Sequence, residues 1–263
     1  MRKLDGKTAF VTGAAMGNGE GVARVFAEHG AHVLLVDISD RVFDTAQAIQ
    51  SKGLRATGYR ADVTKLDDVK KIVENAYKEL GKIDILVNNA GVIQLVSFLE
   101  MSDAVRDFHF NVNINGVWNC AKAVLPYMIK KKYGKIVNLS SVTGPMVCDE
   151  GETAYATSKA AIWGFTKALA REVAKYRITV NAICPGYIYT PMVEKIAQES
   201  NPDNPRTVIE GIAGGVPLGR LGTIKEVGEV AAFLASDESS YITGTHVVID
   251  GGSTLPETVS VGV

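Results

Sequence analysis

Two residues that could move a proton, Tyr155 and Lys159, lie four positions apart in the segment 154–159. In a helix their side chains lie one above the other, about 6 Å apart along the axis. A free tyrosine loses its proton only near pH ~10, but a fixed positive charge nearby lowers the tyrosine pKa. Tyr155 with Lys159 is therefore a candidate proton donor and acceptor. Because the spacing is common by chance, two unrelated residues on a helix surface are the alternative.

A glycine-rich stretch, Thr12–Gly19, follows an apolar run that is predicted as a strand. Its glycines Gly13, Gly17 and Gly19 permit a tight turn and a close approach of the backbone to a pyrophosphate, for which the next helix supplies free N–H groups. The spacing is G-x-x-x-G-x-G rather than the usual G-x-G-x-x-G. We expect a dinucleotide site here, and a glycine-rich turn without a ligand is the alternative.

Asp37 ends the second predicted strand, roughly 20 residues after the glycine loop. An acidic residue there accepts hydrogen bonds from an adenosine ribose and repels the 2′-phosphate of NADP. No arginine or lysine occurs in Gly13–Gly19, and the nearest one after Asp37 is Arg41. NAD is therefore the expected cofactor and NADP the less favoured one, with a solvated strand-end aspartate as the alternative. Asp62 and Val63 follow the third predicted strand and are expected beside the adenine.

The elements that must position these residues alternate between strand and helix along the whole chain. Strands are predicted at Thr8–Thr12, His32–Val36, Arg55–Arg60, Ile83–Val87, Lys135–Leu139, Ile178–Ile183 and His246–Ile249. Helices are predicted at Gly17–His29, Asp40–Lys52, Leu66–Leu80, Asp103–Lys132, Glu152–Tyr176 and Lys225–Ala235. This alternation is typical of an α/β fold with a doubly wound parallel seven-stranded sheet and helices on both faces. We expect one Rossmann-like domain over 1–263, with a mobile insertion at Met192–Val216.

Composition narrows the classes of partner. The chain has 263 residues, 46% of them hydrophobic, and a formal net charge of −1, so no nucleic-acid partner is expected. No apolar run reaches the ~18 residues of a membrane span, and the first residues lack a signal-peptide core. The cysteines Cys120, Cys148 and Cys184 have no metal-site spacing, so no metal is expected, and they fit a reducing cytoplasm.

The ordered motifs of the chain resemble those of the short-chain dehydrogenases/reductases over its whole length. They are Thr12-Gly13 with Gly17 and Gly19, Asp62-Val63, Asn88-Asn89-Ala90-Gly91, Asn113, Ser140-Ser141, Tyr155 with Lys159, Pro185-Gly186 with Thr190, and Asp250-Gly251-Gly252. Together they are far more specific than any single motif. Within the family, the resemblance is closest to the UcpA-like bacterial oxidoreductases, and there it extends to Gly151–Tyr155 and to the tail Leu255–Gly262.

This resemblance implies hydride transfer between a nicotinamide cofactor and a substrate carbon. Tyr155 is then the general acid/base, Lys159 lowers its pKa and binds the nicotinamide ribose, and Ser141 holds the substrate oxygen. Asn113 would hold a water in a proton relay behind Lys159. Cofactor contacts are implied for Gly13, Met16, Asn18, Gly19, Asp37, Ile38, Asp62, Val63, Asn89, Ala90, Gly91, Tyr155, Lys159, Pro185, Gly186, Ile188 and Thr190.

Two features depart from the family pattern. The interval from Ser141 to Tyr155 is one residue longer than usual, and Ser140 would lengthen it further. We therefore favour Ser141, with a structural serine pair at a strand end as the alternative. Asn18 stands where the family usually has isoleucine, which affects side-chain packing against the cofactor but not the backbone contact with phosphate. Structural roles remain open for Asn88, Asn89 and Asn113, and no chemistry is assigned to His29, His32, His109 and His246.

The expected substrate is a small alcohol or carbonyl compound in a pocket framed by two loops and two tyrosines. These are Val92–Val96, Pro145–Glu152, Tyr187 and Tyr189, with the loop after Pro191. Three acidic residues, Asp149, Glu150 and Glu152, lie at one rim of this pocket and are predicted to be solvated. If they face the pocket instead, an anionic substrate is disfavoured. Residues 191–216 are expected to act as a lid, and the apolar tail within 253–263 to dock on a neighbouring subunit. The family implies a homo-oligomer, with a tetramer favoured.

An NAD(H)-dependent dehydrogenase or carbonyl reductase is thus the expected function. The alternatives are a dinucleotide-binding regulatory protein without turnover, an NADPH-dependent carbonyl reductase, and a dehydratase or epimerase. A regulatory protein needs the glycine loop but not Ser141, Tyr155 and Lys159 together, so the retention of all three speaks against it.

Overall fold

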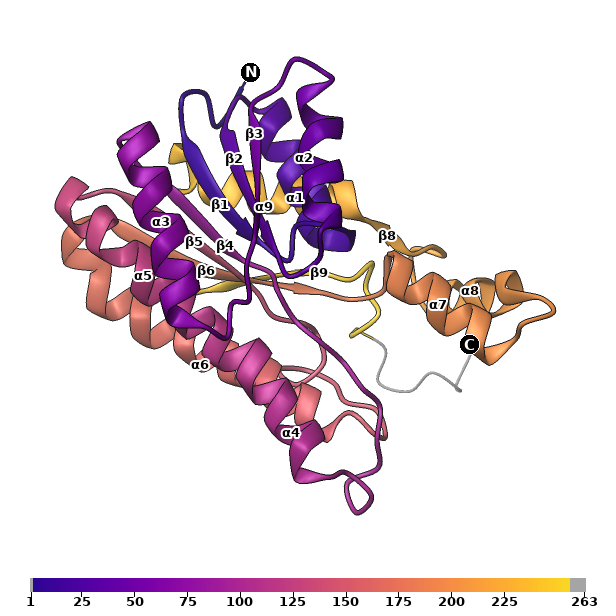
Figure 1. Cartoon of the computed structure of the whole chain (residues 1–263). Coiled ribbons are helices and arrows are strands. Elements are labelled where there is room, and N and C mark those ends of the chain that lie inside the picture. The colour runs from indigo at the N-terminus through magenta and orange to yellow at the C-terminus, as the bar shows by residue number, and fades with distance from the viewer. Residues whose placement is uncertain (1, 256–263) are drawn as a thin grey trace.

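The computed structural model describes residues 2–255 and contains a seven-stranded sheet in which neighbouring strands are parallel (Figure 1). The strand order is β3-β2-β1-β4-β5-β6-β9. This confirms the predicted doubly wound sheet. The strands are β1 Thr8–Thr12, β2 His32–Asp37, β3 Ala56–Arg60, β4 Ile85–Asn88, β5 Gly134–Leu139, β6 Ile178–Pro185 and β9 His246–Ile249.

Six helices cover the two faces of the sheet (Figure 1). Alternate residues of one strand enter opposite cores: Val11 of β1 packs with α1, α2 and α9, whereas Phe10 packs with α3, α5 and α6. Strands buried on both faces explain the continuous apolar runs of the sequence. The helices are α1 Gly17–Glu28, α2 Arg41–Gln50, α9 Ile224–Ala235, α3 Leu66–Leu80, α5 Gly116–Lys131 and α6 Thr153–Val173.

The strand order reverses between β1 and β4, and β4 is the central strand of the sheet. In open α/β sheets, ligands bind beyond the carboxyl ends of the strands at this point. A buried chain of hydrogen bonds crosses the adjacent strands. Asn88 donates to Asn138 (2.8 Å), and Asn138 donates to Thr166 of α6 (2.9 Å). These bonds fix β4, β5 and α6 relative to one another, so the Asn88 side chain has a structural role.

The long helix predicted over Asp103–Lys132 is divided into three parts. It consists of α4 Asp103–Phe110, a π-helical turn at Asn111–Asn115, and α5 Gly116–Lys131. The π turn contains Asn113, one of the predicted site residues. Such turns are rare and are frequent at functional sites.

The segment Met192–Val216, predicted as a mobile insertion, is largely helical, and its mobility stays a prediction. Helices α7 Pro191–Ser200 and α8 Pro205–Gly214 project from the edge of the sheet (Figure 1). Each begins with proline, whose fixed φ suits the first helical turn. A small parallel sheet of β7 Ile188–Tyr189 and β8 Gly222–Thr223 connects this region to α9. The predicted C-terminal tail lies, from residue 256 onward, outside the described residues.

Candidate active site

The glycine loop lies between β1 and α1 and brings the backbone close to any ligand there. Gly13 and Gly17 have φ of 63° and 60°, values that side-chain-bearing residues rarely adopt. A Cβ at Gly19 would lie 2.0 Å from the Gly13 carbonyl oxygen, so only glycine fits. The N-cap residue of α1, Met16, makes no side-chain cap, so the first N–H groups of α1 are available to an anion. These features fit the pyrophosphate of a dinucleotide.

The side chain of Asn89 supports the glycine loop. Its amide donates to the carbonyl oxygens of Thr12 and Gly13, both at 3.0 Å. In return, the Thr12 hydroxyl oxygen accepts from the backbone N–H groups of Asn89 (3.0 Å) and Ala90 (3.1 Å). The Asn89 side chain thus shapes the loop, and the turn-fixing alternative from the sequence describes it well.

The Asp37 carboxylate also has a structural role, which could not be predicted from the sequence. It accepts from the N–H groups of Ala15 (3.0 Å) and Ser39 (2.9 Å), and the Ala15 carbonyl accepts from Thr45 (3.0 Å). The carboxylate therefore supports the glycine loop as well as lying at the end of β2. Asp62 similarly accepts from the backbone and hydroxyl of Thr64.

Asn18 carries a buried side-chain oxygen, Oδ1, that has no hydrogen-bond partner within residues 2–255. A buried acceptor without a partner is costly unless a ligand or water satisfies it. Because Asn18 lies in the uncapped first turn of α1, this oxygen also fits a polar ligand at the loop. The departure from the family's isoleucine therefore adds a polar group at the dinucleotide position.

On α6, Tyr155 and Lys159 lie on one face, as their spacing predicted. The Lys159 ammonium is 5.6 Å from the centre of the Tyr155 ring and donates to the Leu139 carbonyl at the end of β5 (2.9 Å). Burial lowers the pKa of Lys159 to about 8, and the nearby Cys184 opposes that effect. The ammonium is thus held at the carboxyl end of the sheet beside the phenol.

The two serines after β5 have different environments. The Ser140 hydroxyl donates to the Lys159 carbonyl (2.8 Å), so its hydrogen is committed to α6. The Ser141 hydroxyl oxygen accepts from the Thr143 N–H (3.1 Å) and keeps its own hydrogen to donate. Ser141 also lies beside the Tyr155 phenol and lowers its pKa, which Ser140 does not. This geometry supports Ser141, rather than Ser140, as the serine facing a substrate oxygen.

Asn113 lies behind Lys159 and joins α6 to a neighbouring loop. It donates to the carbonyl of Val92 (3.0 Å) and to the Ser158 hydroxyl (2.9 Å), and its oxygen accepts from the Val92 N–H (2.8 Å). A Cβ at Gly91 would lie 3.3 Å from the Asn113 side-chain oxygen and 3.5 Å from the Lys159 nitrogen. Both polar groups therefore border the space beside Gly91.

Charged surroundings act on the Tyr155 phenol. Burial raises its pKa, the adjacent Ser141 hydroxyl acts in the opposite direction, and the Glu152 carboxylate raises the pKa further. Glu152 also raises the pKa of Tyr187, after burial and Asp149. Glu152 therefore lies near both tyrosines, although its carboxylate accepts from the Asp149 N–H (3.1 Å) in an exposed hydrogen bond, as the predicted solvated position implies. Lys159 is not among the causes that act on Tyr155, and the Tyr155 pKa is raised rather than lowered, so the predicted lowering by Lys159 is not seen in this structure. The further lowering by an oxidised nicotinamide stays a prediction.

The other side of the site is formed by residues 185–190. Pro185 ends β6, Ile188 lies in β7, and the Thr190 hydroxyl caps α7. A Cβ at Gly186 would lie 2.6 Å from the Cβ of Asp250, so the segment packs closely against the end of β9. These residues place the backbone of 186–190 across the carboxyl end of the sheet.

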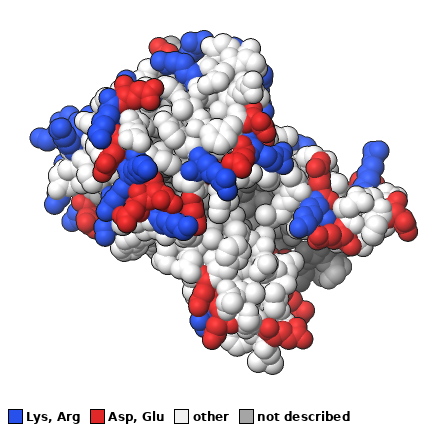
Figure 2. Space-filling view, in the orientation of Figure 1, with Lys and Arg blue, Asp and Glu red and all other residues white. Residues whose placement is uncertain are grey.

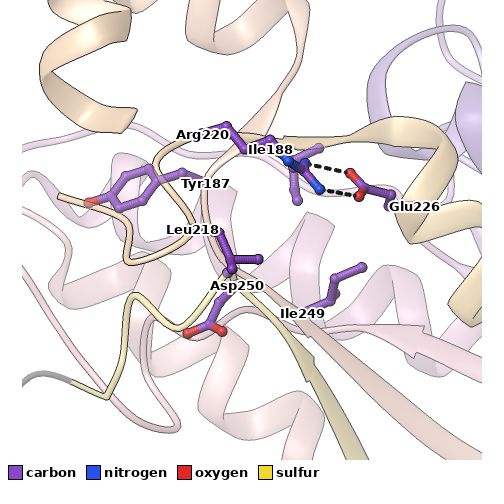
Figure 3. Close-up of a pocket in the computed structure, with 9 residues that line it drawn as sticks. Tyr187, Ile188, Leu218, Arg220, Glu226, Ile249 and Asp250 are labelled. Carbon is purple, nitrogen blue, oxygen red and sulfur yellow. Dashed lines mark hydrogen bonds and ion pairs between the residues drawn. The ribbon is translucent and has the colours of Figure 1, made fainter. Parts of the chain in front are cut away.

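A cavity of about 80 Å³ lies beside this segment, between Ile188, Asp250 and the ion pair of Arg220 with Glu226 (Figure 3). Figure 3 shows the Arg220 guanidinium bound to both Glu226 oxygens, at 2.7 and 3.0 Å. The Asp250 carboxylate accepts from Gly252 and Thr254 and thereby holds the turn at residues 250–254. Because Ser141, Tyr155 and Lys159 do not line this cavity, we assign it no catalytic role.

The chain is similar in sequence to known oxidoreductases. A family model described as enoyl-(acyl carrier protein) reductase matches residues 13–254. The chain is 61% identical to the oxidoreductase UcpA of Salmonella typhimurium over 263 residues, which cover 100% of both chains. The chain belongs to the short-chain dehydrogenase/reductase family. The predicted resemblance to UcpA-like members of this family is confirmed.

Solved structures agree with this membership in the short-chain dehydrogenase/reductase family. The ligand-free aldohexose dehydrogenase of Thermoplasma acidophilum is 34% identical, with a TM-score of 0.90, and the match covers 100% of this chain and 99% of that one. A short-chain type dehydrogenase/reductase from Mycobacterium marinum is 36% identical, with a TM-score of 0.88 and coverage of 97% and 98%. The chain is thus an oxidoreductase of a family that binds nicotinamide dinucleotides.

Among residues 2–255, no helix is long and apolar enough to cross a membrane. No group of three or more histidine, cysteine, aspartate or glutamate side chains in the same range is arranged to hold a metal ion.

Proposed function

We propose that the chain is an NAD(H)-dependent oxidoreductase that interconverts a small alcohol and the corresponding ketone or aldehyde. Nicotinamide supplies the hydride acceptor or donor when it is bound. Tyr155 takes up or delivers the proton at the substrate oxygen, and Ser141 donates a hydrogen bond to that oxygen. The observation that carries the proposal is the Ser141 hydroxyl beside Tyr155, with Lys159 behind them and the uncapped glycine loop nearby.

NAD rather than NADP is proposed because Asp37 places a carboxylate at the end of β2, next to the glycine loop. Arg60, which lies opposite Asp37 in the register of β2 and β3, already donates to the Ile38 carbonyl and to Asp40. Both features oppose a 2′-phosphate. An NADPH-dependent carbonyl reductase is therefore the second choice.

The substrate is proposed to be uncharged or cationic rather than anionic. Glu152 is the N-cap residue of α6, three residues before Tyr155, and its carboxylate raises the Tyr155 pKa. Asp149 and Glu150 follow one another in the adjacent loop, and the charged side chains visible on the projection around α4 are mostly acidic (Figure 2). A substrate carboxylate or phosphate beside Tyr155 would meet like charge.

Helices α7 and α8 are proposed to close over the cofactor as a lid, since they extend from the segment that carries Thr190. We also propose a homo-oligomer, with a tetramer favoured. Trp118 on α5 is 57% exposed although it packs against Phe165 of α6, with ring centres 5.5 Å apart. An exposed aromatic pair of this kind marks a surface suited to association. The free thiols, including exposed Cys148, suit the proposed cytoplasmic location.

The test is a panel of secondary alcohols, ketones and aldehydes with NAD or NADH, followed at the NADH absorbance band. Tyr155→Phe should abolish turnover and leave NADH binding largely intact, because only the proton-transferring hydroxyl is removed. Tyr127→Phe, on α5 against Tyr77, is the matched control. Near-normal turnover in Tyr155→Phe would rule out the proposed proton transfer. NADH binding without turnover across the panel would instead favour the regulatory alternative.

A further inference from the structure

The segment Val92–Val96, which is expected to form one wall of the substrate pocket, is held along one edge. Alternate residues give their N–H groups to three different partners: Val92 to the Asn113 side chain (2.8 Å), Gln94 to His109 (3.0 Å), and Val96 to the Gly151 carbonyl (3.0 Å). A period of two residues is that of an extended chain with one edge bonded. The segment therefore resembles an edge strand whose partner is not a strand.

His109 provides the middle contact and is completely buried. Its Nε2 accepts from the Gln94 N–H, so its hydrogen must lie on Nδ1, which donates to the Val105 carbonyl (2.8 Å). Both ring nitrogens are thus used, and the ring is neutral in this arrangement. This partner of His109 could not be predicted from the sequence, because Gln94 lies on a loop fifteen positions away.

The spacing of the two helical residues matches the spacing of the loop. His109 and Asn113 are four residues apart, or about 6 Å along a helix. Val92 and Gln94 are two residues apart, or about 6.6 Å along an extended chain. The acceptor atoms of His109 and Asn113 are therefore spaced like the N–H groups of Gln94 and Val92, as the acceptors of a neighbouring strand would be.

We propose that His109 is a positioning residue that holds the Val92–Val96 wall at the distance from Tyr155 that substrate binding requires. Gly151, at the other end of this row of contacts, precedes Glu152 and α6, so the wall is connected to the helix of Tyr155. Loss of the His109 acceptor frees the middle of the wall while Asn113 and the glycine loop keep their own bonds. The effect is then on substrate binding rather than on cofactor binding.

Two variants at position 109 separate this role from simple packing. His109→Leu fills much of the ring volume but has no acceptor, whereas His109→Gln places an amide oxygen near the Nε2 position. Hydrogen–deuterium exchange is measured on the full chain with saturating NADH. We expect amides of 91–97 to exchange at least about tenfold faster in His109→Leu, with little change at 13–19 and near-wild-type exchange in His109→Gln.

A second pair of variants changes the donor instead of the acceptor. Gln94→Pro removes the N–H that His109 accepts, and Gln94→Ala keeps that N–H while removing the exposed side chain. Because Gln94 lies on the surface, Gln94→Pro tests the contact even where His109→Leu does not fold. Faster exchange at Val92 and Val96 in Gln94→Pro, but not in Gln94→Ala, is the expected result.

The kinetic readout rests on the proposed function and uses the best substrate of the panel. KM should rise about tenfold in His109→Leu and Gln94→Pro, with kcat and NADH affinity changed less than about twofold. Unchanged exchange at 91–97 in both variants would overturn the proposal, as would equal acceleration in the glycine loop. Because exchange needs no turnover, failure of the proposed oxidoreductase activity is seen separately, in the Tyr155 variants.

Discussion

Asn113 and Lys159 face each other across Gly91. A Cβ added at Gly91 would lie 3.3 Å from the Asn113 side-chain oxygen and 3.5 Å from the Lys159 nitrogen. Both groups are buried, and the Lys159 ammonium has one carbonyl partner, Leu139, within the described chain. The space beside Gly91 is thus where a relay water behind Lys159 would lie, in the arrangement that the family resemblance predicted.

Gly91→Ala should therefore lower turnover without unfolding the protein. The added methyl makes contacts near van der Waals distance but occupies the space between the two polar groups. We expect kcat to fall at least about tenfold, since proton transfer typically contributes a larger factor than this. Steady-state kinetics checks it. Gly164→Ala is the control, because a Cβ at that helical position meets nothing within 4 Å. A Gly91→Ala variant with the kcat of the wild type would contradict a relay water in this space.

Ser140→Ala should mainly lower stability, whereas Ser141→Ala should mainly lower kcat. Loss of the buried Ser140 bond to the Lys159 carbonyl should reduce stability by about 1 kcal/mol. Loss of the Ser141 hydroxyl should leave stability nearly unchanged and reduce kcat by about 100-fold or more. Urea unfolding and steady-state kinetics measure the two quantities. A larger loss of kcat in Ser140→Ala than in Ser141→Ala would show that Ser141 is not the serine that contacts the substrate oxygen.

Asp37→Asn should weaken the preference for NADH over NADPH. The amide removes the negative charge beside the ribose and keeps an oxygen that can accept from Ala15. We expect the ratio of the two dissociation constants to shift by about tenfold towards NADPH, the equivalent of ~1.4 kcal/mol. Titration by nicotinamide fluorescence measures the ratio. Asp44→Asn, on the exposed side of α2, removes the same charge elsewhere, and an equal shift there would contradict a local role for Asp37.

Lys159 should make the stability of the cofactor-free protein depend on pH. Burial lowers its pKa from 10.5 to about 8, so between these values the unfolded chain binds more protons than the folded one. Stability then rises with pH across this window, and the full cost of burying the ammonium is present below it. Lys159→Met removes that cost. We expect Lys159→Met to be more stable than wild type at pH ~7 and its advantage to shrink towards pH ~10.5.

Urea unfolding of both proteins at several pH values checks this expectation. The comparison between variants cancels the titration of other groups. An advantage of Lys159→Met that stays constant from pH ~8 to pH ~10.5 would contradict the lowered pKa.

Local signals were sufficient where one short segment decides a structure. β1, α3 and β9 have the predicted bounds because their apolar periodicity is strong. The two helices after Thr190 were missed although Pro191 and Pro205 are helix-start signals, since their apolar periodicity is weak. The π turn at Asn111–Asn115 left no mark in the sequence, because its apolar pattern continues from α4 into α5.

The sequence by itself determined the fold class, the family and the residues with suitable chemistry, because each depends on residue type and spacing along the chain. Only the tertiary structure decided which groups are free to act. The Ser140 hydrogen is committed to Lys159 and that of Ser141 is not. Glu152 acts on Tyr155, and His109 holds Gln94. Such contacts join segments that are distant in sequence, and burial and hydrogen bonding set the chemistry of a side chain once those segments meet.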